Sequence, residues 1–246
     1  MRKLLALVQR ELLAYFSSPL AYVVLTAFLF INGYVFYLIV AFLNDPRVQA
    51  MAPLKLMFGG TIFFWLYLLF VVPVITMRLL AEERRTGTLE VLLTSPVSEG
   101  QVVIGKFLAA FVFYLFLWLP TWVYVGMLAS HAKIDFGPVW AGYLGIALLG
   151  SLFLSVGLLT SALVRNQIIA AILAFAVLIV VFSLGLVENL VNGAAAKGAL
   201  GYMNLWSHMD DFAKGIVDSR HVVYNLSLTG LFLFLATKAL EASKGR

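Results

Sequence analysis

The sequence predicts an all-α, polytopic membrane protein that crosses a bilayer about six times. Apolar residues make up 63% of its 246 positions, and charged residues only 12%. An ordinary soluble domain has about 45–50% apolar and about 25% charged residues, so this chain could not cover its surface in water. Because six apolar stretches of spanning length leave little chain for a separate soluble module, we predict one membrane domain over residues 1–246.

The chain opens with an amphipathic pattern within residues 1–19. Its apolar positions recur at helical spacing and are Leu4, Leu5, Val8, Leu12, Tyr15 and Phe16. The charged residues Arg10 and Glu11 lie elsewhere on the helical wheel. We predict a helix at the cytoplasmic membrane interface, the alternative being a solvated helix within a larger assembly. Pro19 is expected to end it and to turn the chain into the bilayer.

Six stretches are long enough to cross about 30 Å of hydrocarbon. They are residues 20–43, 58–77, 107–130, 139–164, 168–187 and 222–237, of which the last is the shortest. Pro73 and Pro120 fall inside the second and third spans, where each removes a backbone hydrogen bond and is expected to kink the helix. Small residues follow two rows of the fourth span, which predicts that it is buried against other helices. These residues are Gly142, Ala147, Gly150, Ser151 and Ser155.

The positive charges follow the predicted topology. With the N-terminus in the cytoplasm, eleven of the 17 Lys and Arg residues fall in inside segments and six in outside segments. This bias predicts that both termini are cytoplasmic. Because the basic residues do not gather into a patch of groove size, no nucleic-acid partner is expected.

The predicted spans contain no Asp, Glu, Lys, Arg or His. Ion-coupled transporters place such groups at membrane depth, so the energy for any transport is expected to come from elsewhere. The stretch 100–106 matches the opening of a phosphate-binding loop, but Phe107 stands where Ser or Thr must hold magnesium. Ser98 and Gln101 instead predict a capping box at the root of the third span. We predict no catalytic residue, cofactor site or metal site in this chain.

The predicted cytoplasmic loop between the second and third spans, residues 81–101, is the most informative segment. Its charged residues are Glu82, Glu83, Arg84 and Arg85. A turn at Gly87 follows, and then a short helix that Pro96 ends. That helix carries Leu89, Leu92 and Leu93 on one face. A short two-faced helix suits docking to a protein partner. From spacing alone, a positive-inside loop with an interfacial turn fits equally well.

The run 82–96, with its Glu-Arg-Arg-Thr-Gly-Thr-Leu-Glu core, resembles the signature loop of ABC-2 type transporter permeases. Val97-Ser98 and Gly105-Lys106 are also similar to that family, as are the amphipathic start, the spans and the external stretch. Residues 205–224 resemble the gliding-motility-type branch of the permeases.

The resemblance implies a permease subunit of an ATP-driven transporter, an exporter, in the bacterial inner membrane. Two permease chains would pair, as a homodimer or with a related permease, and an accessory membrane or periplasmic protein is a further partner compatible with the family. Each chain would contact a separate cytoplasmic ATPase subunit, which would bind ATP and Mg²⁺, so that this chain itself hydrolyses nothing. A non-transporting membrane scaffold that uses the same loop to hold a partner is the alternative.

The resemblance also implies which residues couple the permease to the ATPase, through a helix at residues 86–94. By match to the family loop, the transmitting or docking positions are Glu82, Glu83, Gly87, Thr88 and Glu90. The rest of the expected coupling set is Arg84, Arg85, Thr86, Leu89, Leu92 and Leu93. Gly87 has a separate rationale, since a tight turn before a helix favours a residue without Cβ.

The external segment, residues 188–220, is too polar to span and too rich in glycine at its start for one helix. Ser207 and Asp210 predict a capping box for a short helix that ends near Gly215. The resemblance implies short re-entrant helices that close the outer mouth. The polar residues here are expected to cap helices or face water, because they lack the fixed spacing of metal ligands. They include His208, Asp210, Asp211, Asp218 and His221.

Overall fold

The computed structural model describes residues 2–44, 53–88, 98–131, 133–188 and 194–243. Within these ranges every regular element is a helix, and six helical stretches are long and apolar enough to cross a membrane. The elements are α1 (Arg2–Phe16), α2 (Pro19–Leu43), α3 (Pro53–Lys55), η1 (Leu56–Gly60), α4 (Ile62–Thr76), α5 (Ala81–Thr86), α7 (Glu99–Trp118), η2 (Leu119–Thr121), α8 (Trp122–His131), α9 (Phe136–Leu163), α10 (Gln167–Val187), α11 (Ala194–Met203), α12 (Leu205–Ala213) and α13 (Ser219–Ser243). The predicted all-α polytopic membrane fold is confirmed.

Several helices begin at side chains that satisfy the first unpaired backbone N–H groups. Ser98 accepts from the Gln101 N–H (3.3 Å), and the Gln101 side chain accepts from the Ser98 N–H (3.2 Å), which confirms the predicted capping box of α7. Asp135 and Asn166 cap α9 and α10, each accepting from the N–H two residues later at 2.9 Å. Pro19 occupies the first turn of α2, where its missing N–H costs no hydrogen bond.

The two prolines predicted to lie inside spans have different effects. Pro73 lies within α4, and its carbonyl accepts a hydrogen bond from the Met77 N–H (2.8 Å). At Pro120 the regular α-helix stops: α7 ends at Trp118, η2 forms a 3₁₀ turn, and α8 continues the span. Because proline lacks a donor and crowds the turn before it, the third span consists of two helical pieces.

The predicted limits of two spans were wrong. The second was expected to begin at residue 58, but its spanning stretch begins at Pro53 and is interrupted before α4, because Phe58 and Gly59 have non-helical backbones and Gly59 has φ 93°. The last was expected to be the shortest, yet α13 has 25 residues. The apolar run in the sequence ends before Lys238, whereas the helix continues to Ser243.

Helix α9 forms the centre of the bundle, as its small residues predict. The most apolar part of this span is 83% buried, against 11% for α2. Its glycines lie against bulky neighbours: a Cβ at Gly150 would be 2.1 Å from the Tyr114 ring, and one at Gly142 would be 2.6 Å from the Phe58 ring. Close approach of this kind requires glycine, so the rows of small residues on α9 determine which helices can contact it.

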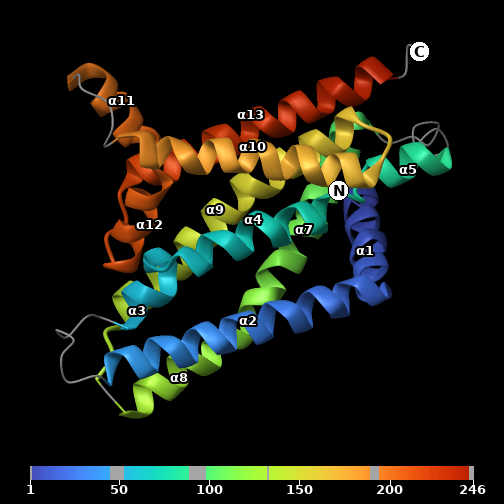
Figure 1. Cartoon of the computed structure of the whole chain (residues 1–246). Coiled ribbons are helices and arrows are strands. Elements are labelled where there is room, and N and C mark those ends of the chain that lie inside the picture. Colours follow the sequence, from blue (N-terminus) through green and yellow to red (C-terminus); the bar gives the residue numbers. More distant parts are fainter. Residues whose placement is uncertain (1, 45–52, 89–97, 132, 189–193, 244–246) are drawn as a thin grey trace.

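The bundle has two distinct ends (Figure 1). The start of α1, the helix α5 and the end of α13 lie at one end, which we call the α5 end. At the opposite end lie α3, α11 and α12, and we call it the α12 end. Because α2, α4, α9 and α10 run between them, charged residues far apart in the sequence gather at each end.

We predict that Gly150→Ala destabilises the bundle, because the added methyl group overlaps the rigid ring of Tyr114. Overpacking of this kind costs about 1–3 kcal/mol. The thermal unfolding midpoint in detergent should fall by several degrees. Gly230→Ala in α13 is the control, since nothing lies within 4 Å of its Cβ position. An equal midpoint for the two variants would contradict the assigned packing.

Candidate functional site

The segment that leaves α4 is fixed to the centre of the bundle by one hydroxyl group. Ser161 of α9 is fully buried, and its Oγ accepts hydrogen bonds from the backbone N–H groups of Leu80 (3.0 Å) and Ala81 (3.1 Å). The same hydroxyl donates to the Met77 carbonyl at 3.2 Å. Two of the unpaired donors at the start of α5 are thus satisfied by the central helix.

Helix α5 is short and carries its charges in the order that favours a helix. Glu82 and Glu83 lie in its first turn, and Arg84 and Arg85 in its last. Carboxylates near the N-terminus and cations near the C-terminus both complement the helix dipole. Gly87 caps the helix with φ 73°, in the left-handed region where glycine avoids steric cost. The predicted turn at this glycine is confirmed.

A buried lysine joins three elements that are distant in sequence. Lys106 of α7 is 1% exposed, and its ammonium group donates to Glu83 of α5 (2.8 Å) and to Glu11 of α1 (3.1 Å). Arg10 adds contacts to Glu11 (2.7 Å) and Glu83 (3.6 Å). A buried ammonium group is costly unless carboxylates surround it, so this cluster holds α1 and α5 against α7.

The glycine before this lysine lets the interfacial helix approach. A Cβ at Gly105 would lie 2.5 Å from the Leu7 side chain, so α1 can pack closely on α7 only because position 105 lacks one. The Gly105-Lys106 pair, which is part of the family resemblance, thus combines close backbone approach with an ion-pair contact.

A second set of contacts connects the turn between α1 and α2 to the end of α4. Arg78 pairs with Glu82 (2.7 Å) and donates to Ser18 Oγ (3.0 Å). The Tyr15 hydroxyl donates to the Ile75 carbonyl at 2.8 Å. Because both contacts cross from the N-terminal segment to the second span, a displacement of α5 would strain the root of α2 as well.

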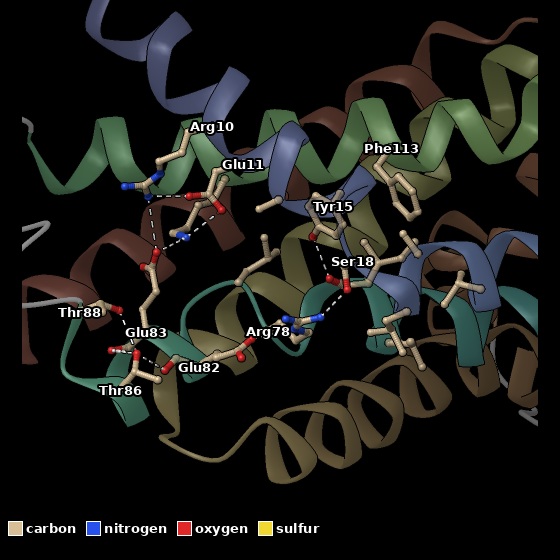
Figure 2. A pocket seen from close by; sticks show the side chains of 18 residues that line it. Arg10, Glu11, Tyr15, Ser18, Arg78, Glu82, Glu83, Thr86, Thr88 and Phe113 are labelled. Atoms are coloured by element: carbon tan, nitrogen blue, oxygen red, sulfur yellow. Dashed lines mark hydrogen bonds and ion pairs between the residues drawn. The ribbon is translucent and has the colours of Figure 1, made fainter.

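These contacts surround a cavity of about 430 Å³ between α1, α2, α4 and α5. Figure 2 shows Arg10, Glu11 and Glu83 on one side of it, and Arg78 with Ser18 on another. Its remaining wall is mostly apolar and includes Ala21, Val24, Val74, Ile75 and Phe113. We call this space the charged cavity.

Residues 48–204 match the model of a family described as ABC-2 family transporter protein. The match covers more than half of the chain, including residues 81–101 and four of the six candidate spans. The chain belongs to this family. It is therefore a multi-pass membrane permease component of an ABC transporter, the component that typically lacks an ATPase site of its own. No curated protein shows significant similarity to it. The gliding-motility-type branch stays a prediction.

The structure divides the predicted coupling residues of this permease into two groups. Glu82, Glu83 and Arg84 point back to the bundle, and Arg84 donates to the Ala239 carbonyl of α13 at 3.4 Å. The group from Arg85 to Thr88 is exposed. Leu89, Glu90, Leu92 and Leu93, and with them most of the predicted helix at 86–94, lie outside the described residues.

Sequence reasoning missed four residues of this site: Glu11, Arg78, Lys106 and Ser161. In the sequence, Lys106 directly precedes the third predicted span, and a lysine at such a position ordinarily faces water. The signal that could have found it is Glu11, a carboxylate in a helix whose apolar face must pack on the bundle. Ser161 carries no sequence signal beyond its position near the end of a span.

At the α12 end of the permease, the predicted capping box of Ser207 and Asp210 is wrong. Helix α12 begins earlier, because the Asn204 side chain accepts from the N–H groups of Trp206 (3.0 Å) and Ser207 (3.4 Å). Asp210 instead pairs with Lys55, 3.0 Å away. The helix ends near Gly215 as predicted, with φ 86° at that glycine.

Two histidine side chains, one from α12 and one from α13, lie in contact. The rings of His208 and His221 have centroids 3.9 Å apart, and His221 Nε2 lies 3.0 Å from Asp211. Asp218, the other carboxylate near them, accepts from the Arg220 N–H. Within the ranges that the structure describes, no three His, Asp or Glu side chains are arranged to hold a metal ion. Burial, and then the neighbouring His221, lower the pKa of His208 to about 4.

We predict that Lys106→Met loosens α1, because two largely buried carboxylates lose their buried cation and keep only the half-exposed Arg10. Loss of one partner from a buried pair costs about 3–5 kcal/mol, and the partial exposure of Glu11 and Glu83 places this site at or below the lower value. Hydrogen exchange at the backbone amides of α1 should accelerate. Lys238→Met, which removes an exposed pair with Glu241, is the control. Unchanged exchange in α1 would contradict the assigned role.

We predict that acid destabilises the α12 end through His208. Its folded pKa, about 4, lies below the unfolded value of about 6.5, so the neutral form contributes stability above pH 6.5. That contribution declines as the pH falls from about 6.5 and is lost once it has passed through about 4. Thermal midpoints measured across this window should fall more steeply for the natural chain than for His208→Gln. Parallel profiles would contradict the assignment.

Proposed function

We propose that this chain is the permease subunit of an ATP-driven exporter in the bacterial inner membrane. The α5 end faces the cytoplasm, and a separate ATPase subunit, which binds ATP and Mg²⁺, docks on the coupling loop. The observation that carries this proposal is the buried contact of Lys106 with Glu83 and Glu11. It connects the one loop that matches the family signature to two other elements of the bundle.

The contacts suggest how work would pass from the ATPase into the membrane. A force on the exposed turn from Arg85 to Thr88 acts on α5. Helix α5 is held to α7 through Lys106, and its start is held to α9 through Ser161. Because both links are buried and short, the loop cannot move without moving or straining these helices. The coupling function of residues 82–90, Leu92 and Leu93 is part of this proposal.

The composition of the spans and the burial of α9 support a proposal for the energy source and the subunit arrangement. The predicted spans contain no Asp, Glu, Lys, Arg or His that could bind a driving ion, which favours an external ATPase. The centre of one chain is filled by α9, so a translocation path between two copies fits the structure better than a path through one. We therefore propose a homodimer, with export as the direction that the family resemblance implies.

The competing function is a scaffold that uses the same loop only to hold a partner. Both functions require binding at the coupling loop, but only the transporter requires that the loop control ATP turnover. Measuring binding and turnover in the same variants separates them.

We predict that Gly87→Asp and Glu90→Lys reduce the ATPase rate of the complex at least about tenfold, equal to about 1.4 kcal/mol in activation free energy. Gly87 has φ 73°, which an aspartate adopts at a cost. The tagged chain would be purified from its native host with its ATP-binding subunit and reconstituted in liposomes. Glu241→Lys, a charge reversal on α13 at the same end, is the control.

Three outcomes decide the proposal. Turnover that falls while the ATPase subunit still co-purifies supports coupling. Turnover equal to that of the natural chain in both variants rejects the assigned loop. Co-purification with a partner that hydrolyses no ATP favours the scaffold.

A further inference from the structure

The charged cavity continues into an apolar groove. This second hollow, of about 620 Å³, runs between α2 and α4 and is lined by apolar and aromatic side chains. Leu20, Val24 and Val74 line both spaces, so the two are contiguous. Together they form one site with a polar head at the α5 end and an apolar tail toward the middle of the membrane.

The groove is long enough to hold one lipid acyl chain. Its lining residues on α2 extend from Leu20 to Val35. At 1.5 Å per residue this stretch is about 22 Å long, whereas one half of the hydrocarbon core is about 15 Å thick. An acyl chain of one leaflet therefore fits within it. The low burial of α2, 11% in its most apolar part, leaves the groove accessible from the bilayer.

The head of the site is balanced in charge. Three cations and three carboxylates line the cavity, namely Arg10, Arg78, Lys106, Glu11, Glu82 and Glu83. Arg10 and Arg78 keep 54% and 40% of their side chains exposed, so each can reach a phosphate. The Glu83 Oε2 atom is buried and accepts no hydrogen bond from the described residues. A buried carboxylate oxygen without a donor is costly, and a rotation of the Glu83 carboxylate would turn it toward the ammonium group of a ligand in the cavity.

We propose that this site binds a zwitterionic phospholipid whose headgroup carries a phosphate and a primary ammonium group. The headgroup lies in the charged cavity and one acyl chain lies in the α2–α4 groove. An anionic lipid is disfavoured because it brings no cation to the carboxylates and would upset the balance of three cations and three carboxylates. A segment of a protein partner would leave the membrane-depth groove unfilled. This inference stands whether or not an ATPase subunit docks nearby.

Occupancy would connect the bilayer to the coupling loop. The headgroup would touch Glu83 and Arg78, which hold α5 to α7 and to the α1–α2 turn. A bound lipid would therefore stabilise the same contacts that transmit force from the loop.

The test is native mass spectrometry of the full chain in detergent, titrated with phosphatidylethanolamine, phosphatidylcholine and phosphatidylglycerol. Phosphatidylethanolamine should bind tightest, because phosphatidylcholine has no N–H to donate and phosphatidylglycerol has no ammonium group. Val24→Trp should fill the junction of cavity and groove, and Arg78→Gln should remove a phosphate contact. Each should weaken phosphatidylethanolamine binding at least about tenfold.

Matched controls keep the test specific. Ile172→Trp adds the same bulk on the exposed face of α10, and Lys238→Gln removes a cation from α13, and neither residue lines the site. Both should bind lipid as the natural chain does. The proposal is overturned if neither site variant weakens binding more than its control, or if phosphatidylglycerol binds as tightly as phosphatidylethanolamine. It is also overturned if Arg78→Gln affects only association with an ATPase subunit.

Discussion

The ammonium group of Lys106 constrains the α5 end of this permease more than any other single group. It is 1% exposed, and such a charge is tolerated only beside opposite charges. The carboxylates that meet this need come from α1 and from α5, 95 and 23 residues away in sequence. The positions of both helices therefore follow from one buried cation, and the exposed turn from Arg85 to Thr88 inherits its orientation from α5.

The centre of the bundle depends on residues that have no side chain, the glycines of α9. Gly142, Gly150 and Gly157 of α9 lie against a phenylalanine, a tyrosine and a threonine that leave no space for a Cβ. Lipid offers no hydrophobic force between helices, so close packing of this kind provides the attraction that holds them together. The hydrogen bonds of Ser161 in this closely packed helix and the buried ion pairs of Lys106 thus hold α5 to both the central helix and α7.

The sequence predicts the fold well because its strongest signals are local. Apolar runs define the spans, and residues such as Ser98 and Gly87 specify a cap and a turn through their own chemistry. The predictions fail where a partner distant in sequence decides. Lys106 is buried because Glu11 reaches it. Asn204, three residues before Ser207, caps α12 and is itself held by a hydrogen bond to Glu188, 16 residues away. Ser161 could not be predicted, since a lone serine in a span most often bonds within its own helix.

The two ends of the bundle are closed by ion pairs that differ in contact with water. The side chain of Lys106 at the α5 end is 2% exposed, whereas the side chains of Lys55 and Asp210 at the α12 end are 44% and 37% exposed. Dissolved ions screen exposed charges and hardly reach buried ones. A higher ionic strength of the surrounding medium therefore weakens the contact of α3 with α12 through Lys55 and Asp210 more than the contacts of Lys106 with α1 and α5.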